Sequence, residues 1–508
     1  MSSKKQLIIN LIASVVAFIV NMGISFLITP YITKSIGVEA YGFVSLGSNF
    51  INYASLVTIA LNSMAGRFIT IEIHKDNWQA ANKYFNSVLI ANVVVAGVML
   101  VPTIICVAYI EKIVNVPAKI LIDVRILFAF LFANFLISIV VSSFGVATFA
   151  TNKLYLQSLR NIEAIIIKAI LLVLLFIYLK PAVSFLGFTA FIVLLYTTFF
   201  NLYYTKKLLP KIKIDKVYFD YKAIIELISS GIWNTITRVG EILLEGVDLL
   251  ISNLFISATA MGTLALAKTV PTAILSLVGV VSAVFIPDFT ILFAQDKTDE
   301  LLISIKRSMK LLGIIATIPV SILVSFGEEF YKLWVPNQNP KLLQILSIIT
   351  VAKIIVNGSI NSIYGVFTVT NKLKTNAMLL LFTGVINLAI IFILIQMTNL
   401  GIYAIAGVST ALSIIRNLAF TAPYGAKCLG LKWHTFFPEI IKGIAAFIVV
   451  TIIGMSINIL FEVSSWQRFL ALSAVTSVLG LIINIMVILN KFERNQIKLL
   501  IKQKLNIR

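Results

Sequence analysis

Long apolar segments follow one another along almost the whole chain, separated by short polar connections. A helix needs about 20 apolar residues to cross the hydrocarbon core of a bilayer, and most of the segments reach that length. With 59% hydrophobic and 12% charged residues, the 508-residue chain has too few polar side chains to cover a soluble protein. We therefore predict an all-α, polytopic membrane protein of about 14 transmembrane helices, at 7–32, 43–65, 85–109, 121–149, 162–179, 183–204, 224–256, 263–287, 309–327, 342–367, 377–396, 402–422, 439–461 and 469–489.

The basic residues are distributed unevenly between the two sides of this predicted membrane protein. The chain carries 41 Lys and Arg against 21 Asp and Glu, which gives a net charge of +20. With a cytoplasmic N-terminus, 28 of the basic residues fall on the cytoplasmic side and eight on the outer side, as the positive-inside rule expects. The cytoplasmic ones are concentrated in the connection 206–222 and in the tail 491–508. The charge therefore indicates topology, and we expect no nucleic-acid partner.

Motifs for catalysis, metal binding and nucleotide hydrolysis are missing from the sequence. Cys106 and Cys428 fall on opposite predicted sides of the membrane, and His74 and His434 fall in predicted loops. There is no HExxH motif, no Cys/His metal cluster and no phosphate-binding loop. The outer connections are too short for a catalytic domain. We therefore predict a protein that is not an enzyme, has no catalytic residues and binds no metal or organic cofactor.

The sequence contains an internal repeat. Residues 144–154 read FGVATFATNKL, and residues 364–373 read YGVFTVTNKL, at an offset of 220. The same offset places Tyr41-Gly42 on Met261-Gly262. Six spans separate the copies, so the two halves share one orientation, as in transporters built from parallel repeats. We predict two six-helix lobes at 1–205 and 223–422, joined by a basic cytoplasmic linker at 206–222, with two extra helices and a basic tail at 423–508.

Polar residues recur on the seventh predicted span at helical spacing. They are Ser230, Asn234, Arg238, Glu241, Glu245, Asp248 and Ser252. An ionisable side chain at the centre of a spanning helix costs about 2.5–3.5 kcal/mol, so this face lines a wet cavity or pairs with neighbours. Because three carboxylates accompany one arginine, we expect Glu241, Glu245 or Asp248 to carry a coupling proton or Na⁺. Alternatively, Arg238 and Glu241 form a structural ion pair.

Other predicted spans extend this polar pattern. The first and second spans carry Asn and Ser stripes that include Asn49 and Asn52, and the eighth span carries Lys268. Spans 1, 2, 7 and 8 are therefore expected to line one central cavity between the halves. Alternatively, the Asn and Ser side chains serve as hydrogen-bonding contacts between helices. Isolated charges, which either face the cavity or reach toward a membrane interface, lie at Arg67, Lys168, Lys353 and Arg416.

Residues 27–46, LITPYITKSIGVEAYGFVSL, combine Pro30 near the end of the first span with Ile36-Gly37 and Tyr41-Gly42. Together with the pattern of spans, this resembles the Wzx-type flippases of the multidrug/oligosaccharidyl-lipid/polysaccharide exporter superfamily. The resemblance implies a V-shaped, two-lobe transporter of the bacterial inner membrane. It would move undecaprenyl-diphosphate-linked oligosaccharide by alternating access, for O-antigen, capsule or exopolysaccharide biosynthesis. It also implies lumenal residues that receive the diphosphate and sugars, for which the candidates are Arg238, Lys268, Arg67, Lys353, Arg416, Asn234, Asn49 and Asn52.

Three other functions stay open at this point. A cation-coupled multidrug exporter would use the carboxylates of the seventh span, and a peptidoglycan-precursor flippase would share the lipid carrier. A membrane-embedded polysaccharide polymerase would need a larger outer loop with catalytic residues. The Pro, Ile-Gly, Tyr-Gly pattern and the extra spans 13 and 14 favour the polysaccharide flippase. We expect a monomer with both termini in the cytoplasm, whose partners are the bilayer, the lipid-linked glycan and the polysaccharide polymerase.

Overall fold

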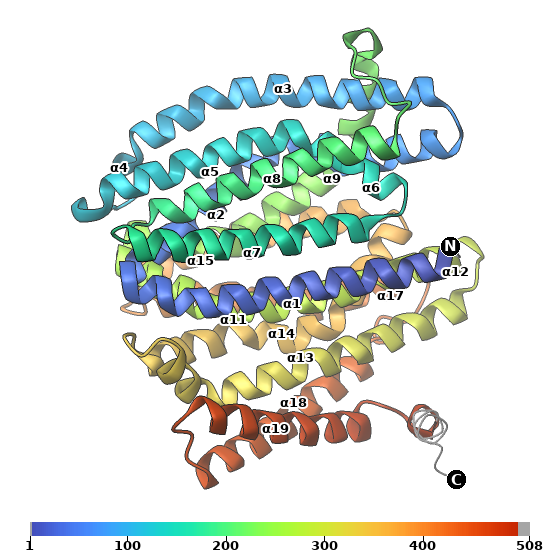
Figure 1. Ribbon diagram of the computed structural model, residues 1–508. Helices are drawn as coiled ribbons and strands as arrows, with labels where there is room; N and C mark the ends of the chain where they lie inside the picture. The colour runs from blue at the N-terminus through green and yellow to red at the C-terminus, as the bar shows by residue number, and fades with distance from the viewer. Residues whose placement is uncertain (1–2, 496–508) are drawn as a thin grey trace. The chain divides into compact units, whose positions relative to one another are not determined.

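The computed structural model describes residues 3–495, and its long elements are all α-helices (Figure 1). Within these residues, 13 helices are long and apolar enough to cross a membrane. The all-α membrane fold predicted from the apolar segments is thereby confirmed. Of the predicted basic tail, the part from residue 496 onward lies outside the described residues.

The helices form two compact units, and the first contains the chain as far as Ala265 together with Ala377–Leu388. Helix α11 (Ala258–Ala283) begins in this unit, and α15 (Leu373–Met397) contributes its central turns. The other elements are α1 (Ser3–Ile36), α2 (Val38–His74), α3 (Trp78–Ala108), α4 (Ile110–Ile113), η1 (Ala118–Ile120), α5 (Leu121–Val141), η2 (Ser142–Gly145), α6 (Val146–Ala150), α7 (Leu154–Tyr178), α8 (Ser184–Leu208), η3 (Lys216–Tyr218), α9 (Tyr221–Glu241), η4 (Ile242–Gly246) and α10 (Asp248–Phe255).

Helix α2 is at the centre of the first unit, where it packs against α3, α5 and α9. Its Phe43 and Leu46 are fully buried, as is Phe128 of α5. Around it, α1, α7, α8, α5 and α3 lie side by side in that order (Figure 1). The outer helices expose large apolar side chains such as Leu27 and Val98, which is the surface that hydrocarbon tails require.

The second unit contains Leu266–Asn376 and the chain from Ala389 onward. Its central element is α13, which packs against both α14 and α18 and buries Phe326 and Tyr331. Its elements, besides the parts of α11 and α15, are α12 (Ile286–Ala294), α13 (Thr298–Trp334), α14 (Pro340–Val369), α16 (Ile402–Arg416), η5 (Asn417–Thr421), α17 (Ala422–Cys428), α18 (Phe437–Leu460) and α19 (Trp466–Val487).

The predicted repeat recurs in the backbone geometry of the helix ends. Asp76 and Asp296 each have φ 55°, and Asn152 and Asn371 each have φ 54°. After each of the four, the next residue donates its backbone N–H to the carbonyl five positions earlier, over 2.8–3.0 Å. Asn and Asp tolerate this left-handed conformation better than other residues with a Cβ. The same helix-ending turn is therefore encoded at equivalent places in both copies.

The two glycines that the repeat pairs also meet in space. A Cβ atom on Gly42 would lie 2.7 Å from the Cα atom of Gly262, and one on Gly262 would lie 2.2 Å from the carbonyl oxygen of Val38. Both glycines belong to the first unit. The start of α11 therefore crosses the start of α2 at a separation that only glycine allows.

The seventh predicted span, 224–256, differs from the others. The chain is helical here through α9, η4 and α10, but this stretch is not among the 13 apolar helices. The prediction of one regular helical stripe is wrong, because η4 is a π turn in which the N–H of Val247 bonds the carbonyl of Ile242 over 3.1 Å. A π turn contains an extra residue, so the polar side chains before and after it do not continue on one face.

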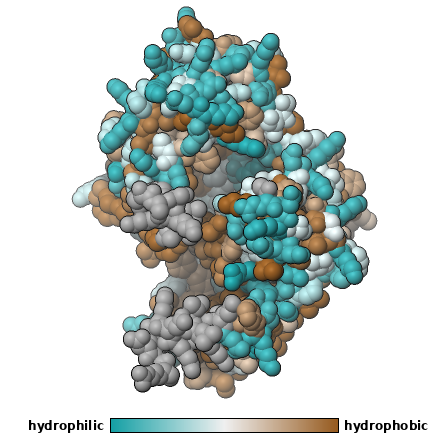
Figure 2. Space-filling model, turned by 90° about the vertical axis from the view of Figure 1, so that its right-hand side faces the viewer, coloured by the Kyte–Doolittle hydropathy of each residue, from teal (hydrophilic) through white to brown (hydrophobic). Residues whose placement is uncertain are grey.

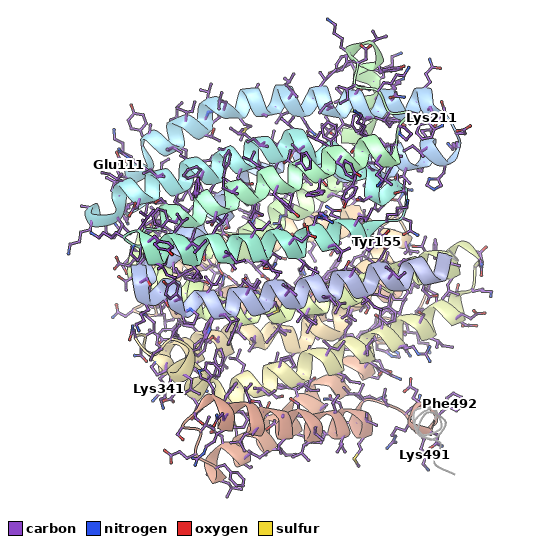
Figure 3. The ribbon with its side chains drawn as sticks, viewed as in Figure 1. Glu111, Tyr155, Lys211, Lys341, Lys491 and Phe492 are labelled. Atoms are coloured by element: carbon purple, nitrogen blue, oxygen red, sulfur yellow. The ribbon has the colours of Figure 1, made fainter. Side chains whose placement is uncertain are left out.

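Polar residues gather at the helix ends. On the side shown in Figure 2, hydrophilic side chains cover most of the helix ends and loops. In the first unit, Glu111 and Lys211 lie at opposite helix ends, and in the second unit Lys341 and Lys491 do the same (Figure 3). Apolar helix shafts between polar ends are the pattern that a bilayer imposes.

Candidate functional site

The candidate site is on α9, whose start is fixed by charged and capping groups. The Asp220 carboxylate accepts the backbone N–H of Lys222 over 2.8 Å and forms an ion pair with Lys83 of α3. The hydrogen bond from Lys83 and the bond from the Lys222 backbone hold the pKa of Asp220 below its usual value of 3.8. This capping contact fixes the first turn of α9 beside α3.

One close contact then sets α9 against α2. A Cβ atom on Gly231 would lie 2.0 Å from the carbonyl oxygen of Ala60. Only a glycine admits such an approach of two helix backbones. The polar residues that follow on α9 are therefore held within hydrogen-bonding reach of the Asn and Ser stripe on α2.

Arg238 connects the polar residues of α9 with the Asn and Ser residues of α2. Its Nη1 pairs with the Glu241 carboxylate at 2.9 Å, and its Nη2 donates to Oδ1 of Asn52 at 3.1 Å. One turn earlier, the Asn234 amide donates to the Ser63 hydroxyl at 3.2 Å. The side chains of Arg238 and Glu241 are 38% and 49% exposed. The alternative structural ion pair is thus present, but it leaves both charged groups accessible.

The π turn is supported by side chains from two other helices. The Asn49 amide and the Tyr53 hydroxyl of α2 both donate to the carbonyl of Gly246, at 3.0 and 2.6 Å. The Asn387 amide of α15 donates to the carbonyls of Leu243 and Leu244, at 3.1 and 3.0 Å. A π turn disrupts the regular helical hydrogen-bond ladder, and these donors supply hydrogen-bond partners for its carbonyls.

The three predicted ion-coupling carboxylates lie in different surroundings. Glu241 is exposed and paired with Arg238, Glu245 within the π turn is half-buried, and Asp248 just after it is only 1% exposed. The Ser252 hydroxyl, one turn beyond Asp248, is fully buried and has no hydrogen-bond partner among the described residues. These carboxylates therefore do not form one continuous charged face.

The other predicted cations are distributed over both units. Arg67 is an exposed residue of α2 in the first unit. Lys268, Lys353 and Arg416 belong to the second unit, where Lys268 is half-buried and Lys353 is buried. Arg416 is 8% exposed, and its Nη2 donates to the Tyr364 hydroxyl at 2.5 Å and to Oδ1 of Asn417 at 3.1 Å.

Sequence reasoning missed the residues that support the π turn. Tyr53 stands among the Asn and Ser residues of the second predicted span but was not counted with them, and Asn387 is the one amide in the middle of the eleventh predicted span. Asn115 and Asn253, which exchange three hydrogen bonds between the α4–η1 connection and α10, were missed as well. No spacing signal links such positions, although an amide inside an apolar span is itself a sign of a buried partner. No group of three or more His, Cys, Asp or Glu that could hold a metal ion occurs among residues 3–495.

Comparison with known families decides the affiliation. The family model of polysaccharide biosynthesis proteins matches residues 7–293, more than half of the chain. The chain belongs to this family. The resemblance to the Wzx-type flippases of the exporter superfamily is thereby confirmed. The match includes the whole of α9, η4 and α10 and therefore the candidate site.

Relatives of known sequence or structure agree with this family. The uncharacterized membrane protein EpsK of Bacillus subtilis is 27% identical over 486 residues, 96% of each chain. The structure of the lipid II flippase MurJ in an inward closed conformation has a TM-score of 0.68 at 14% identity, over 96% of this chain and all of MurJ. An inward-facing multidrug MATE transporter has a TM-score of 0.59 at 12% identity, over 84% and 98%. The fold of this family member is thus the one shared by MurJ and MATE transporters.

Proposed function

We propose that this family member transports undecaprenyl-diphosphate-linked oligosaccharide units across the bacterial inner membrane, from the cytoplasmic to the outer leaflet. It would do so by alternating access, with both termini in the cytoplasm, to supply a polysaccharide polymerase that makes O-antigen, capsule or exopolysaccharide. No covalent bond of the glycan is made or broken in this role. The observation that carries the proposal is the accessible Arg238, held between Asn52 and Glu241 in a membrane protein of the polysaccharide biosynthesis family.

The chemistry of this face suits a diphosphate joined to sugars. An arginine guanidinium has donors in a planar fork that fits phosphate oxygens, and it stays charged at every relevant pH. Asn49, Asn52 and Asn234 offer amide groups of the kind that bind sugar hydroxyls. Because Glu241 neutralises Arg238 when the site is empty, we propose that an incoming diphosphate displaces this carboxylate. Arg67, Lys268, Lys353 and Arg416 would bind the anionic head at other stages of transport.

The displaced carboxylate also offers a route to ion coupling. A carboxylate that loses its cationic partner to a diphosphate takes up a proton or a cation more readily, because the negative charge beside it disfavours its own free charge. We propose that Glu241, with Glu245 and Asp248, carries the coupling proton or Na⁺. Each carboxylate is replaced in turn, as Glu241→Gln, Glu245→Gln and Asp248→Asn. We expect transport in at least one of these variants to lose its dependence on the ion gradient. Unchanged ion dependence in all three variants would refute this coupling role.

The proposed substrate is tested in a deletion strain that carries the wild-type or a variant chain. We expect Arg238→Ala to reduce surface polysaccharide at least tenfold and to accumulate lipid-linked intermediates in the cytoplasmic leaflet. Arg238→Lys, which keeps the charge but loses the fork, should give an intermediate level. The matched control is Arg468→Ala, because Arg468 is an exposed arginine whose side-chain hydrogen bonds, within residues 3–495, go to Glu462 and Ser464 of the preceding connection. Normal surface polysaccharide in Arg238→Ala would refute its role.

The same strain distinguishes the other candidate functions. A deletion strain with intact surface polysaccharide and raised sensitivity to cationic drugs would identify a multidrug exporter. Arrest of peptidoglycan synthesis on depletion would identify a precursor flippase. Each result would contradict the proposed substrate while leaving the family and the fold in place.

A further inference from the structure

The first unit contains a second polar location, in a cavity away from the α9 face. The cavity has a volume of about 550 Å³ and lies among α1, α2, α5, α7 and α8. A volume of this size is in the range of small-ligand pockets. Most of its lining is aliphatic, and the exceptions are Asn21, Ser25, Thr29, Tyr41, Asn134, Lys168 and Thr197. Lys168 is thus the one formal charge in the lining.

Lys168 has no counter-charge among the described residues. It lies in the middle of the membrane-spanning α7 (Leu154–Tyr178), where a charged residue costs about 2.5–3.5 kcal/mol on insertion scales. No ion pair or hydrogen bond joins its ammonium group to any of residues 3–495. The nearest carboxylate along α7, Glu163, is bound by Arg160 at 2.5 Å and by the Tyr196 hydroxyl. A charged ammonium group in such surroundings is stabilised by an anionic partner, which residues 3–495 do not supply.

The neutral groups of the lining differ in what they can still donate. The hydroxyls of Thr29 and Thr197 donate to backbone carbonyls of their own helices. Asn21 accepts a hydrogen bond from Ser25, at 3.4 Å, but its amide N–H groups bond to nothing in the described chain. The Asn134 amide uses one N–H on the Ala190 carbonyl, at 3.1 Å, which leaves the second free. The unused N–H donors of the cavity are therefore the amide groups of Asn21 and Asn134.

From this combination we infer that the cavity around Lys168 binds a small monovalent anion of the halide class. Lys168 would be the counter-ion, and Asn21 and Asn134 would be further donors. One ammonium group neutralises one monovalent anion. Bidentate recognition of phosphate favours the planar fork of arginine, and this cavity offers one lysine and no arginine. A water molecule occupies about 30 Å³ of liquid volume, so the cavity has room for the anion and several waters. The inference is independent of the proposed function.

The anion site is tested on the purified full-length chain in nanodiscs. Thermal unfolding is compared in sodium chloride, sodium bromide and sodium gluconate at equal ionic strength, and binding of radioactive chloride is measured directly. A ligand that binds only the folded state raises Tm by mass action. We expect chloride and bromide to raise Tm by several degrees over gluconate, and one chloride to bind per chain.

Two variants assign the effect to Lys168. In Lys168→Gln the chloride-dependent rise in Tm and the bound chloride should both disappear, while Tm in gluconate equals or exceeds that of the wild type. The control Lys180→Gln removes an exposed lysine just beyond the same helix and should respond to chloride like the wild type. Equal Tm in chloride and gluconate for the wild type would overturn the inference, as would chloride binding that persists in Lys168→Gln. Sodium phosphate is compared at the same ionic strength. If phosphate raised Tm and the halides did not, the inference would be overturned as well, because the site would then bind an oxyanion.

Discussion

Single residues decide how close the helices of the candidate site can approach. Gly231 lets α9 contact the backbone of α2 at Ala60. This contact brings Nη2 of Arg238 within 3.1 Å of Oδ1 of Asn52. The backbone contact at Gly231 thereby also positions both charged side chains of the Arg238–Glu241 pair. The position of the Arg238 guanidinium therefore depends on the absence of a side chain at Gly231.

Gly231→Ala should separate α9 from α2. The added methyl group would overlap the Ala60 carbonyl, and overpacking of this kind costs about 1–3 kcal/mol. We expect a lower Tm in detergent together with reduced polysaccharide export. Gly97→Ala on α3 is the control, because no atom lies within 4 Å of its added Cβ, and it should leave Tm unchanged or slightly higher. Equal behaviour of the two variants would contradict the tight contact.

At the scale of elements, the π turn η4 is stabilised from outside its own helix. Asn387 of α15 bonds two of its carbonyls, and α2 bonds a third through Asn49 and Tyr53. The turn therefore depends on the positions of two other helices.

Asn387→Leu should destabilise the π turn. The loss of a buried hydrogen-bond donor costs about 1–3 kcal/mol, because the carbonyls it leaves behind stay desolvated. We expect a lower Tm and faster hydrogen exchange in 242–248. Asn376→Leu is the matched control on the same helix, since Asn376 is buried and its amide has no hydrogen bond to the described chain. Protection of 242–248 that is unaffected in Asn387→Leu would contradict this account.

The start of α9 should depend on pH. Because the pKa of Asp220 is lowered in the folded protein, first by Lys83 and then by the Lys222 backbone, its carboxylate stabilises the fold above the ordinary value of 3.8. That contribution is lost as the pH falls through the lowered pKa. We expect faster hydrogen exchange in 221–224 below about pH 4 and a weaker pH response in Asp220→Asn. An identical pH response in Asp220→Asn would show that another group is responsible.

At the scale of the whole molecule, charge and hydropathy determine how the chain lies in the bilayer. The basic linker at 206–222 and the connections on its side should face the cytoplasm, while Glu111 and Lys341 should face outward. Figure 3 places Glu111 and Lys211 at opposite helix ends of the first unit, as this topology requires.

Labelling single cysteines with a membrane-impermeant maleimide tests this topology. In a background with Cys106→Ser and Cys428→Ser, we expect Glu111→Cys and Lys341→Cys to react in intact spheroplasts. Lys211→Cys should react only after the membrane is opened. The reverse pattern would invert the topology and place both termini outside.

The sequence alone determined the membrane fold and the repeat, because hydropathy, turn residues and charge are properties of local segments. The apolar runs predicted the spanning helices, and the motif around Asn152 and Asn371 predicted two equivalent helix ends. The ionisable residues of 224–256 marked the one stretch of this kind that is too polar for an ordinary span.

Tertiary structure decided which of these polar residues meet. The π turn interrupts the stripe after Glu241, so Asp248 is buried while Arg238 stays accessible. Its supporting donors come from α2 and α15, about 140 to 200 residues away in sequence. The cavity around Lys168 likewise combines five helices. A periodic pattern indicates which residues share one helix face, whereas partners and cavities depend on how the faces of distant segments pack.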